Sequence, residues 1–153
     1  GNLALGVVVG AAAAGAAPPL AVALLSPWAD LTHSGDSHAI GEGLDPTLSI
    51  KHFLEPASLA YAGGMSLAFP GISPLFAEFP DPFPPTVIST ATRDPLLSDS
   101  VRIAAKLRKQ GATVDLQVAE GLWHVYEYYP ELPEAAQSIR QIAAFLSRYL
   151  PAE

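Results

Sequence analysis

Two apolar runs of strand length, separated by a helical pattern, constrain the fold of this chain more than any other feature. The first run is Thr86–Thr92 and the second is Val114–Val118. Between them, residues 98–110 show helical spacing that ends before Gly111. The order strand, helix, strand predicts two buried parallel strands joined by a helix.

A polar residue with catalytic potential follows each of these two runs. Asp94 lies in Arg93-Asp94-Pro95-Leu96, and His124 closes Gly121-Leu122-Trp123-His124. Ligands of parallel sheets bind beyond the carboxyl ends of the strands, so Asp94 and His124 can face a common site. Such a pair is typical of the orienting carboxylate and general base of a nucleophilic triad. From spacing alone, a helix-capping Asp94 and an ordinary loop histidine remain the alternative.

Further apolar segments extend this unit into a larger fold. Residues 1–17 carry no charge and end at Pro18-Pro19, short of the roughly 20 residues that a membrane span needs. They predict a helix packed between a sheet and other helices, and neither a membrane span nor a signal peptide. Leu20–Leu25 predicts another buried strand, and Pro133 opens a final amphipathic helix. The sequence thus predicts one α/β domain over residues 1–153, with a mainly parallel sheet and flanking helices.

Residues 31–85 form a long excursion between two predicted strands. They contain one predicted helix, around Ser49–Tyr61, and a proline-rich connection, Phe79–Pro85. Long loops within a domain are usually functional, which favours a lid or substrate-binding segment over a disordered linker. Large apolar side chains there and just before it suit an apolar substrate, with packing as the alternative for Trp28. The pocket candidates are Trp28, Phe53, Leu54, Phe69, Leu75 and Phe76.

The charge balance and the residue types narrow the possible partners. The formal charge is −7, and the eight basic residues form no cluster, so nucleic acid and anionic membranes are unsuitable partners. The chain has no cysteine, so disulfide bonds and thiol chemistry are excluded. His33, His38 and His52 match no metal-ligand spacing and are interpreted as scattered surface histidines. No metal site is expected.

Five blocks of sequence carry a family resemblance. They are Gly1-Asn-Leu-Ala-Leu, Ser26-Pro-Trp-Ala-Asp-Leu, Pro84-Pro85-Thr-Val-Ile, Asp94-Pro-Leu-Leu-Ser-Asp99 and Glu120-Gly-Leu-Trp-His124. In this order they resemble the second half of esterases of the hormone-sensitive-lipase family, within the α/β-hydrolase fold. The resemblance implies that Asp94 is the triad acid and His124 the triad base, with no cofactor. It also implies that Asp99 braces the loop carrying His124, whereas the residues alone equally allow Asp99 to cap a helix.

The departure from the family pattern is as informative as the match. In the family the nucleophile stands in Gly-Asp-Ser-Ala-Gly-Gly before Asn-Leu-Ala, so Gly1 would correspond to the final glycine. The serine and the oxyanion-hole glycines would therefore belong to an upstream half of the same enzyme. The serines in residues 35–38 and 64–68 lack the flanking strand and glycine of a nucleophile elbow and are predicted to lie in turns or the lid. We therefore expect the isolated chain to be inactive.

The parent enzyme is expected to hydrolyse small apolar esters through a Ser-Asp-His triad. An amidase or thioesterase on the same triad is an alternative, because no residue excludes it. Another is a non-catalytic ligand-binding protein on this fold, as in the gibberellin receptors, which the presence of both Asp94 and His124 disfavours. Without the upstream half, the strand edge at Leu20–Leu25 is expected to be exposed and to favour a homodimer.

Overall fold

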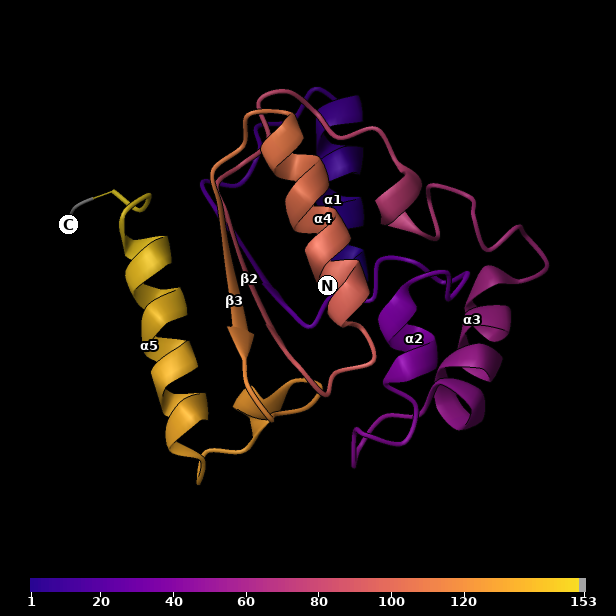
Figure 1. Cartoon of the computed structure of the whole chain (residues 1–153). Coiled ribbons are helices and arrows are strands. Elements are labelled where there is room, and N and C mark those ends of the chain that lie inside the picture. The colour runs from indigo at the N-terminus through magenta and orange to yellow at the C-terminus, as the bar shows by residue number, and fades with distance from the viewer. Residues whose placement is uncertain (152–153) are drawn as a thin grey trace.

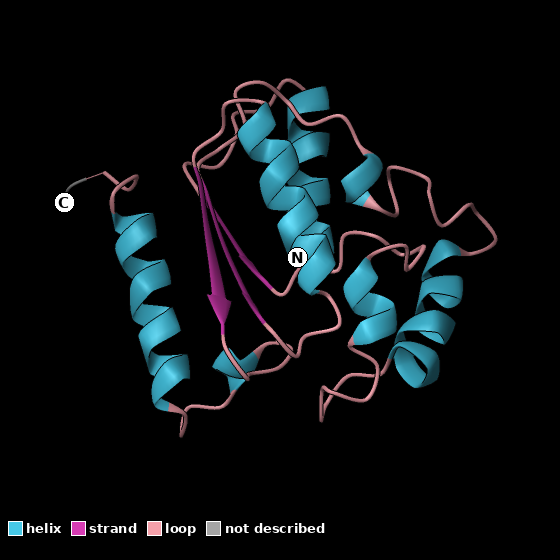
Figure 2. Ribbon diagram, viewed as in Figure 1, coloured by secondary structure: helices cyan, strands magenta, loops and turns pink. Residues whose placement is uncertain are grey.

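Three parallel strands form the centre of the structure, a computed structural model that describes residues 1–151 (Figure 1, Figure 2). They are β1 (Val22–Leu25), β2 (Thr86–Ala91) and β3 (Val114–Ala119), in the order β1-β2-β3. All six residues of the central β2 are buried, as its continuous apolar character predicts. The predicted α/β fold with a parallel sheet is confirmed.

The strands start at the same level of the sheet. Thr86 at the start of β2 pairs with Val22 on one side and Val114 on the other. The helix α4 (Leu97–Lys109) connects β2 with β3, close to the predicted bounds. Because all three strands run in the same direction, the chain leaves β1, β2 and β3 at one edge of the sheet.

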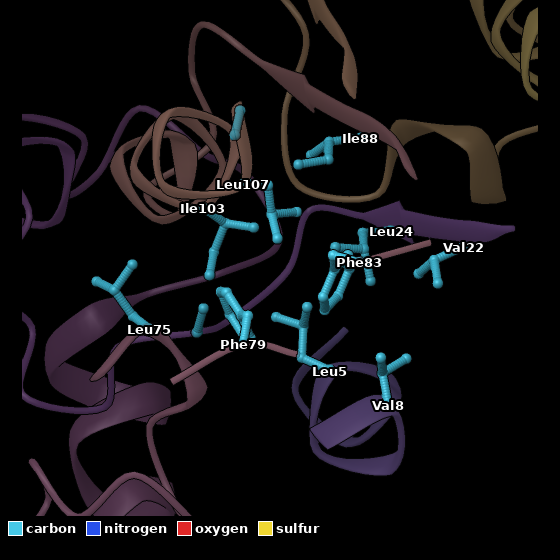
Figure 3. Close-up of a cluster of buried hydrophobic side chains, with 12 residues drawn as sticks. Leu5, Val8, Val22, Leu24, Leu75, Phe79, Phe83, Ile88, Ile103 and Leu107 are labelled. Atoms are coloured by element: carbon cyan, nitrogen blue, oxygen red, sulfur yellow. The ribbon is translucent and has the colours of Figure 1, made fainter. Parts of the chain in front are cut away.

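Helices cover both faces of the sheet. The helices α1 (Asn2–Ala13) and α4 lie on one face, and α5 (Pro133–Ser147) lies on the other (Figure 1). Neighbouring side chains of β2 point to opposite faces of the sheet. Ile88 packs in the cluster with residues of α1 and α4, and Val87 packs against residues of α5. Figure 3 shows the larger cluster. Its buried members are Leu5, Val8, Val22, Leu24, Ala29, Leu75, Phe79, Phe83, Ile88, Ile103, Ala104 and Leu107.

The helix α1 packs against the sheet in one cluster with residues of α4, but the described residues cover it on one side only. The helix buries Leu5 and Val8, whereas Leu3 and Val7 are 70% and 66% exposed. Within residues 1–151 its partners lie on one side only, so an apolar composition does not bring all-round burial. No helix of the described chain combines the length and the hydropathy that crossing a bilayer requires.

The excursion folds into short helices. They are α2 (Asp36–Ile40), a π-helical turn (Ile50–Leu54), α3 (Glu55–Ala62) and a 3-10 turn (Pro74–Phe76). The π-helical turn and α3 together confirm the helix predicted around Ser49–Tyr61. Two small apolar clusters hold the excursion, and Trp28 packs against both. Their buried members are Leu31, Ala62 and Ile72 in one, and Ile50, Leu54 and Leu96 in the other.

The segment Gly35–His38, interpreted from the sequence as part of a turn or lid, forms the start of α2 and not a turn. Reciprocal hydrogen bonds hold this helix against α4: the Ser37 amide donates to Ser98 Oγ (2.9 Å), and the Ser98 amide donates to Ser37 Oγ (2.8 Å). These partners are 61 residues apart. A short helix stabilised by such distant contacts leaves no periodic signal in its own sequence.

Truncation of the core should be costly. We expect Ile103→Ala to lower the free energy of unfolding by about 2–5 kcal/mol, because Ile103 is fully buried between α4 and the sheet. The control is Val101→Ala on the same helix, where Val101 is 44% exposed and the change should stay within about 0.5 kcal/mol. Urea unfolding followed by tryptophan fluorescence measures both. Equal effects would contradict the packing described here.

Candidate active site

Asp94 is held by the turn that follows β2. Its side chain is completely buried. Oδ1 accepts a hydrogen bond from the Leu96 amide (2.9 Å), and Oδ2 accepts one from Thr90 Oγ1 (3.1 Å). These contacts with its own strand and turn fix the orientation of the carboxylate.

The structure brings His124 to this carboxylate. His124 Nδ1 lies 3.3 Å from Asp94 Oδ1, although the two residues are 30 positions apart. The imidazole is 24% exposed, whereas the carboxylate is inaccessible to solvent. With Nδ1 facing Asp94, Nε2 lies on the other side of the ring. The geometry suits an imidazole that exchanges a proton through Nε2 while Asp94 fixes its orientation.

The environment of Asp94 keeps it ionised. Burial raises the pKa of this carboxyl group, but its hydrogen bond and charge interaction with His124 lower it, as do hydrogen bonds from Ser26 and the Leu96 amide. Together these contacts hold the pKa of Asp94 below its ordinary value. At neutral pH Asp94 is therefore an acceptor for the Nδ1–H of His124.

The loop before His124 is tied to the loop after β2. The Arg93 amide donates to the Leu122 carbonyl (3.0 Å), and the Gly121 amide donates to Thr92 Oγ1 (2.8 Å). Gly121 has φ +73°, a left-handed conformation that favours glycine. One bond between main-chain groups and one from a main-chain amide to a side-chain hydroxyl thus join the two loops that carry Asp94 and His124.

The prediction that Asp99 braces the loop carrying His124 was wrong. Asp99 Oδ2 accepts hydrogen bonds from the amides of Ala29 and Asp30, both 2.8 Å. Asp99 Oδ1 lies 2.8 Å from Nε2 of His38. Asp99 therefore fixes the loop after β1 and the helix α2. The interpretation of His38 as a surface histidine was also wrong, because His38 is only 3% exposed. Its partner, Asp99, lies 61 residues away in the sequence.

Sequence reasoning missed two residues that hold the His124 loop. Asp45 Oδ2 accepts a hydrogen bond from the His124 amide (2.7 Å), and Ser26 Oγ accepts one from the Val125 amide (3.2 Å). The spacing of Asp45 and Thr47 is typical of an Asx turn, which is the local signal that the sequence offers. The long-range contact with His124 leaves no such signal.

The predicted pocket residues do not gather in one place. Leu54 and Leu75 are buried in separate apolar clusters, and Phe53, Phe69 and Phe76 are exposed. Trp28 is the candidate that lines an apolar hollow of about 260 Å³ beside the start of α1. The hollow is lined by Asn2, Leu3, Trp28, Leu31, Ala57 and Tyr61. Apolar composition identified a suitable segment but not the face to which each side chain points.

The acidic and histidine side chains of residues 1–151 form no cluster of three or more that could hold a metal ion. The polar groups around His124 instead bond to each other and to the main chain. The arrangement suits proton transfer by an imidazole.

The matched family is described as the α/β hydrolase fold, and it covers residues 1–128. This chain belongs to the α/β-hydrolase family. The matched residues include all three strands of the sheet and both members of the Asp94–His124 pair.

Similar α/β-hydrolase proteins are esterases. The crystal structure of one esterase has a TM-score of 0.93 and 38% identity, over 98% of this chain and 46% of that protein. An esterase from the bacterial hormone-sensitive lipase family has a TM-score of 0.90 and 28% identity, over 96% and 49%. An esterase of Acinetobacter venetianus is 29% identical over 128 residues, 83% of this chain and 42% of that protein. The resemblance to hormone-sensitive-lipase esterases is thus confirmed, and the chain spans about half the length of these relatives.

Another buried carboxylate, that of Asp30, also supports the loop after β1. Asp30 accepts hydrogen bonds from Thr32 Oγ1 (2.5 Å), Ser34 Oγ (2.5 Å) and Arg102 Nη1 (2.7 Å). Burial raises the pKa of Asp30, but the contacts with Ser34, Thr32 and Arg102 outweigh it and lower the pKa from 3.8 to about 2. Protonation of Asp30 therefore opposes folding.

Asp30 should make the free energy of unfolding depend on pH in the acidic range. Since its pKa is lowered on folding, its contribution is complete above about pH 4 and is lost as the pH falls towards 2. We expect Asp30→Asn to cost about 2 kcal/mol at pH 7 and progressively less below pH 4. Urea midpoints measured from pH 2 to 7 test this, with the exposed Asp81→Asn as control. A constant difference between wild type and Asp30→Asn across this range would refute it.

Proposed function

We propose that this chain is the acid–base half of a serine carboxylesterase whose nucleophile lies in a segment upstream of Gly1. The contact of 3.3 Å between His124 Nδ1 and Asp94 Oδ1 carries this proposal. It joins a buried, ionised carboxylate to a partly exposed imidazole at the carboxyl ends of adjacent parallel strands. Similarity to esterases supports ester hydrolysis as the reaction.

The position of Gly1 supports an upstream nucleophile. A Cβ atom at Gly1 would lie 2.5 Å from Pro27 Cα, so the residue fits there only as glycine. Pro27 follows Ser26, whose hydroxyl accepts the hydrogen bond from the Val125 amide. A serine placed shortly before Gly1 would therefore enter beside the loop of His124.

The proposed chemistry is acyl transfer. The upstream serine attacks the ester carbonyl while His124 Nε2 takes its proton, and His124 then returns that proton to the departing alcohol. In the second half, water attacks the acyl-enzyme while His124 takes a proton from it, and His124 then gives that proton to the departing serine oxygen as the acid is released. Asp94 stays ionised, holds the Nδ1–H tautomer and stabilises the imidazolium. The oxyanion donors would come from the upstream segment.

The substrate proposed is a small apolar ester. The hollow beside α1 has a volume of about 260 Å³, and Trp28, Leu31 and Tyr61 give it apolar walls. Asn2 ties the start of α1 to these walls, since its side-chain amide donates to the carbonyls of Trp28 (3.0 Å) and Ile72 (2.8 Å). We place an apolar part of the substrate there, with residues 31–85 acting as a lid.

The upstream half is also the proposed partner of the exposed apolar surface. Within the described residues β1 pairs on one side only, and Leu3 and Val7 of α1 are exposed. A strand added beside β1 would satisfy its free main-chain groups and bring apolar surface towards α1. In the absence of that half, the edge at residues 20–25 would favour a homodimer.

The isolated chain of 153 residues should be inactive. It supplies Asp94 and His124 but no serine in a nucleophile elbow, so p-nitrophenyl butyrate should be hydrolysed at the rate in buffer. Intact-mass spectrometry first establishes that the sample is this polypeptide alone. Steady turnover that disappears in His124→Ala would sink this prediction.

Co-expression with the upstream segment should produce a labelled, active enzyme. A fluorophosphonate probe should modify the serine, and His124→Ala should lower kcat by roughly 10⁴-fold or more, with about 10³- to 10⁴-fold for Asp94→Asn. His52→Ala is the control, because His52 is exposed and should keep activity within about twofold. Ester hydrolysis is the measurement. Probe labelling without ester turnover would point to an amidase or thioesterase, and absence of labelling would point to a binding protein.

A further inference from the structure

Side chains from two other segments hold the main chain at His124. The His124 amide donates to Asp45 Oδ2 (2.7 Å), and the next amide, of Val125, donates to Ser26 Oγ (3.2 Å). Val125 has φ +48°, a left-handed conformation that costs energy for a β-branched residue. The backbone around the imidazole therefore depends on partners outside its own loop.

Asp45 divides its two oxygens between two tasks. Oδ1 accepts hydrogen bonds from the Thr47 amide (2.7 Å), Thr47 Oγ1 (2.8 Å) and the Leu48 amide (2.9 Å), which closes a turn within the excursion. Oδ2 accepts the His124 amide. The carboxylate is 7% exposed, so all of these bonds form away from bulk water. Asp45 thus links a turn of the excursion to the main chain of His124.

We propose that Asp45 is a positioning residue for His124. Through Asp45, the position of the excursion determines the position of the His124 imidazole. This inference rests on the proposed function, in which His124 is the general base. At 3.3 Å, the contact between Asp94 and His124 is at the long end of hydrogen bonding, so a small shift of the His124 main chain breaks it. Asp45 acts through the backbone and touches neither substrate nor imidazole.

Three variants separate this role from a structural one. Asp45→Asn keeps the shape, but its single carbonyl oxygen is expected to serve the three donors of Thr47 and Leu48, which leaves an NH₂ facing the His124 amide. Asp45→Ser retains the capacity for a turn but is too short to reach His124. Thr47→Val is the matched control, because it removes one donor to Oδ1 and leaves the bond at Oδ2 intact.

The kinetic test uses the complete enzyme, with this chain and its upstream segment. Asp45→Asn and Asp45→Ser should lower kcat for p-nitrophenyl butyrate by about tenfold to a hundredfold with KM nearly unchanged, since misplacing a catalytic group by about 1 Å has effects of that size. Fluorophosphonate labelling should slow by the same factor. Thr47→Val should stay within about threefold of wild type. Equal kcat in Asp45→Asn and wild type, or an equal loss in Thr47→Val, overturns the proposal.

A second readout is independent of activity. Hydrogen exchange at the His124 amide should be at least tenfold faster in the two Asp45 variants than in wild type and Thr47→Val, because this N–H loses its acceptor. Unchanged exchange overturns the proposal even where kcat falls. If the wild-type enzyme neither hydrolyses esters nor reacts with the probe, the proposed function fails, while amide exchange still decides whether Asp45 holds His124. Melting temperatures establish that each variant is folded during these measurements.

Discussion

The parallel pairing of β2 with both of its neighbours is the constraint on which the site depends. Because the three strands run in the same direction from a common level, their exits meet at one edge of the sheet. Ser26 follows β1, Asp94 follows β2 and His124 follows β3. An antiparallel neighbour would deliver its following loop to the opposite edge. The direction of the strands therefore places a hydroxyl, a carboxylate and an imidazole side by side.

Buried carboxylates turn this arrangement into a fixed one. Asp30, Asp45, Asp94 and Asp99 are almost inaccessible to solvent, and each accepts several hydrogen bonds from its own loop or from other segments. Burying a charge is costly, and bonds from amides, hydroxyls and Arg102 offset that cost. The loops around the site are thus held by buried side-chain oxygens that accept several hydrogen bonds each. Such a frame keeps the imidazole of His124 oriented.

The parts of the fold with a local signal could be predicted from the sequence. The periodicity of β2 and α4 and the glycine after that helix predicted the strand–helix–strand unit. The geometry of parallel sheets indicated that Asp94 and His124 can face a common site, and the family resemblance implied that they form a pair. The partners of Asp99 and His38 could not be predicted, since contacts over about 60 residues depend on how helices pack. The exposure of one side of α1 could not be predicted for a related reason: the composition shows that the helix is apolar, but its neighbours decide which face is covered. Which apolar side chains of the excursion share a pocket depends on its three-dimensional path.

Asp45 binds an amide that every residue except proline would offer at position 124. The contact is therefore indifferent to the side chain that it helps to place. Loop shape and proton chemistry are encoded separately here, so the identity of the residue at this position can change while the path of the backbone is kept. Replacement of His124 by any residue other than proline would therefore remove the imidazole and keep the main-chain hydrogen bond that holds the loop.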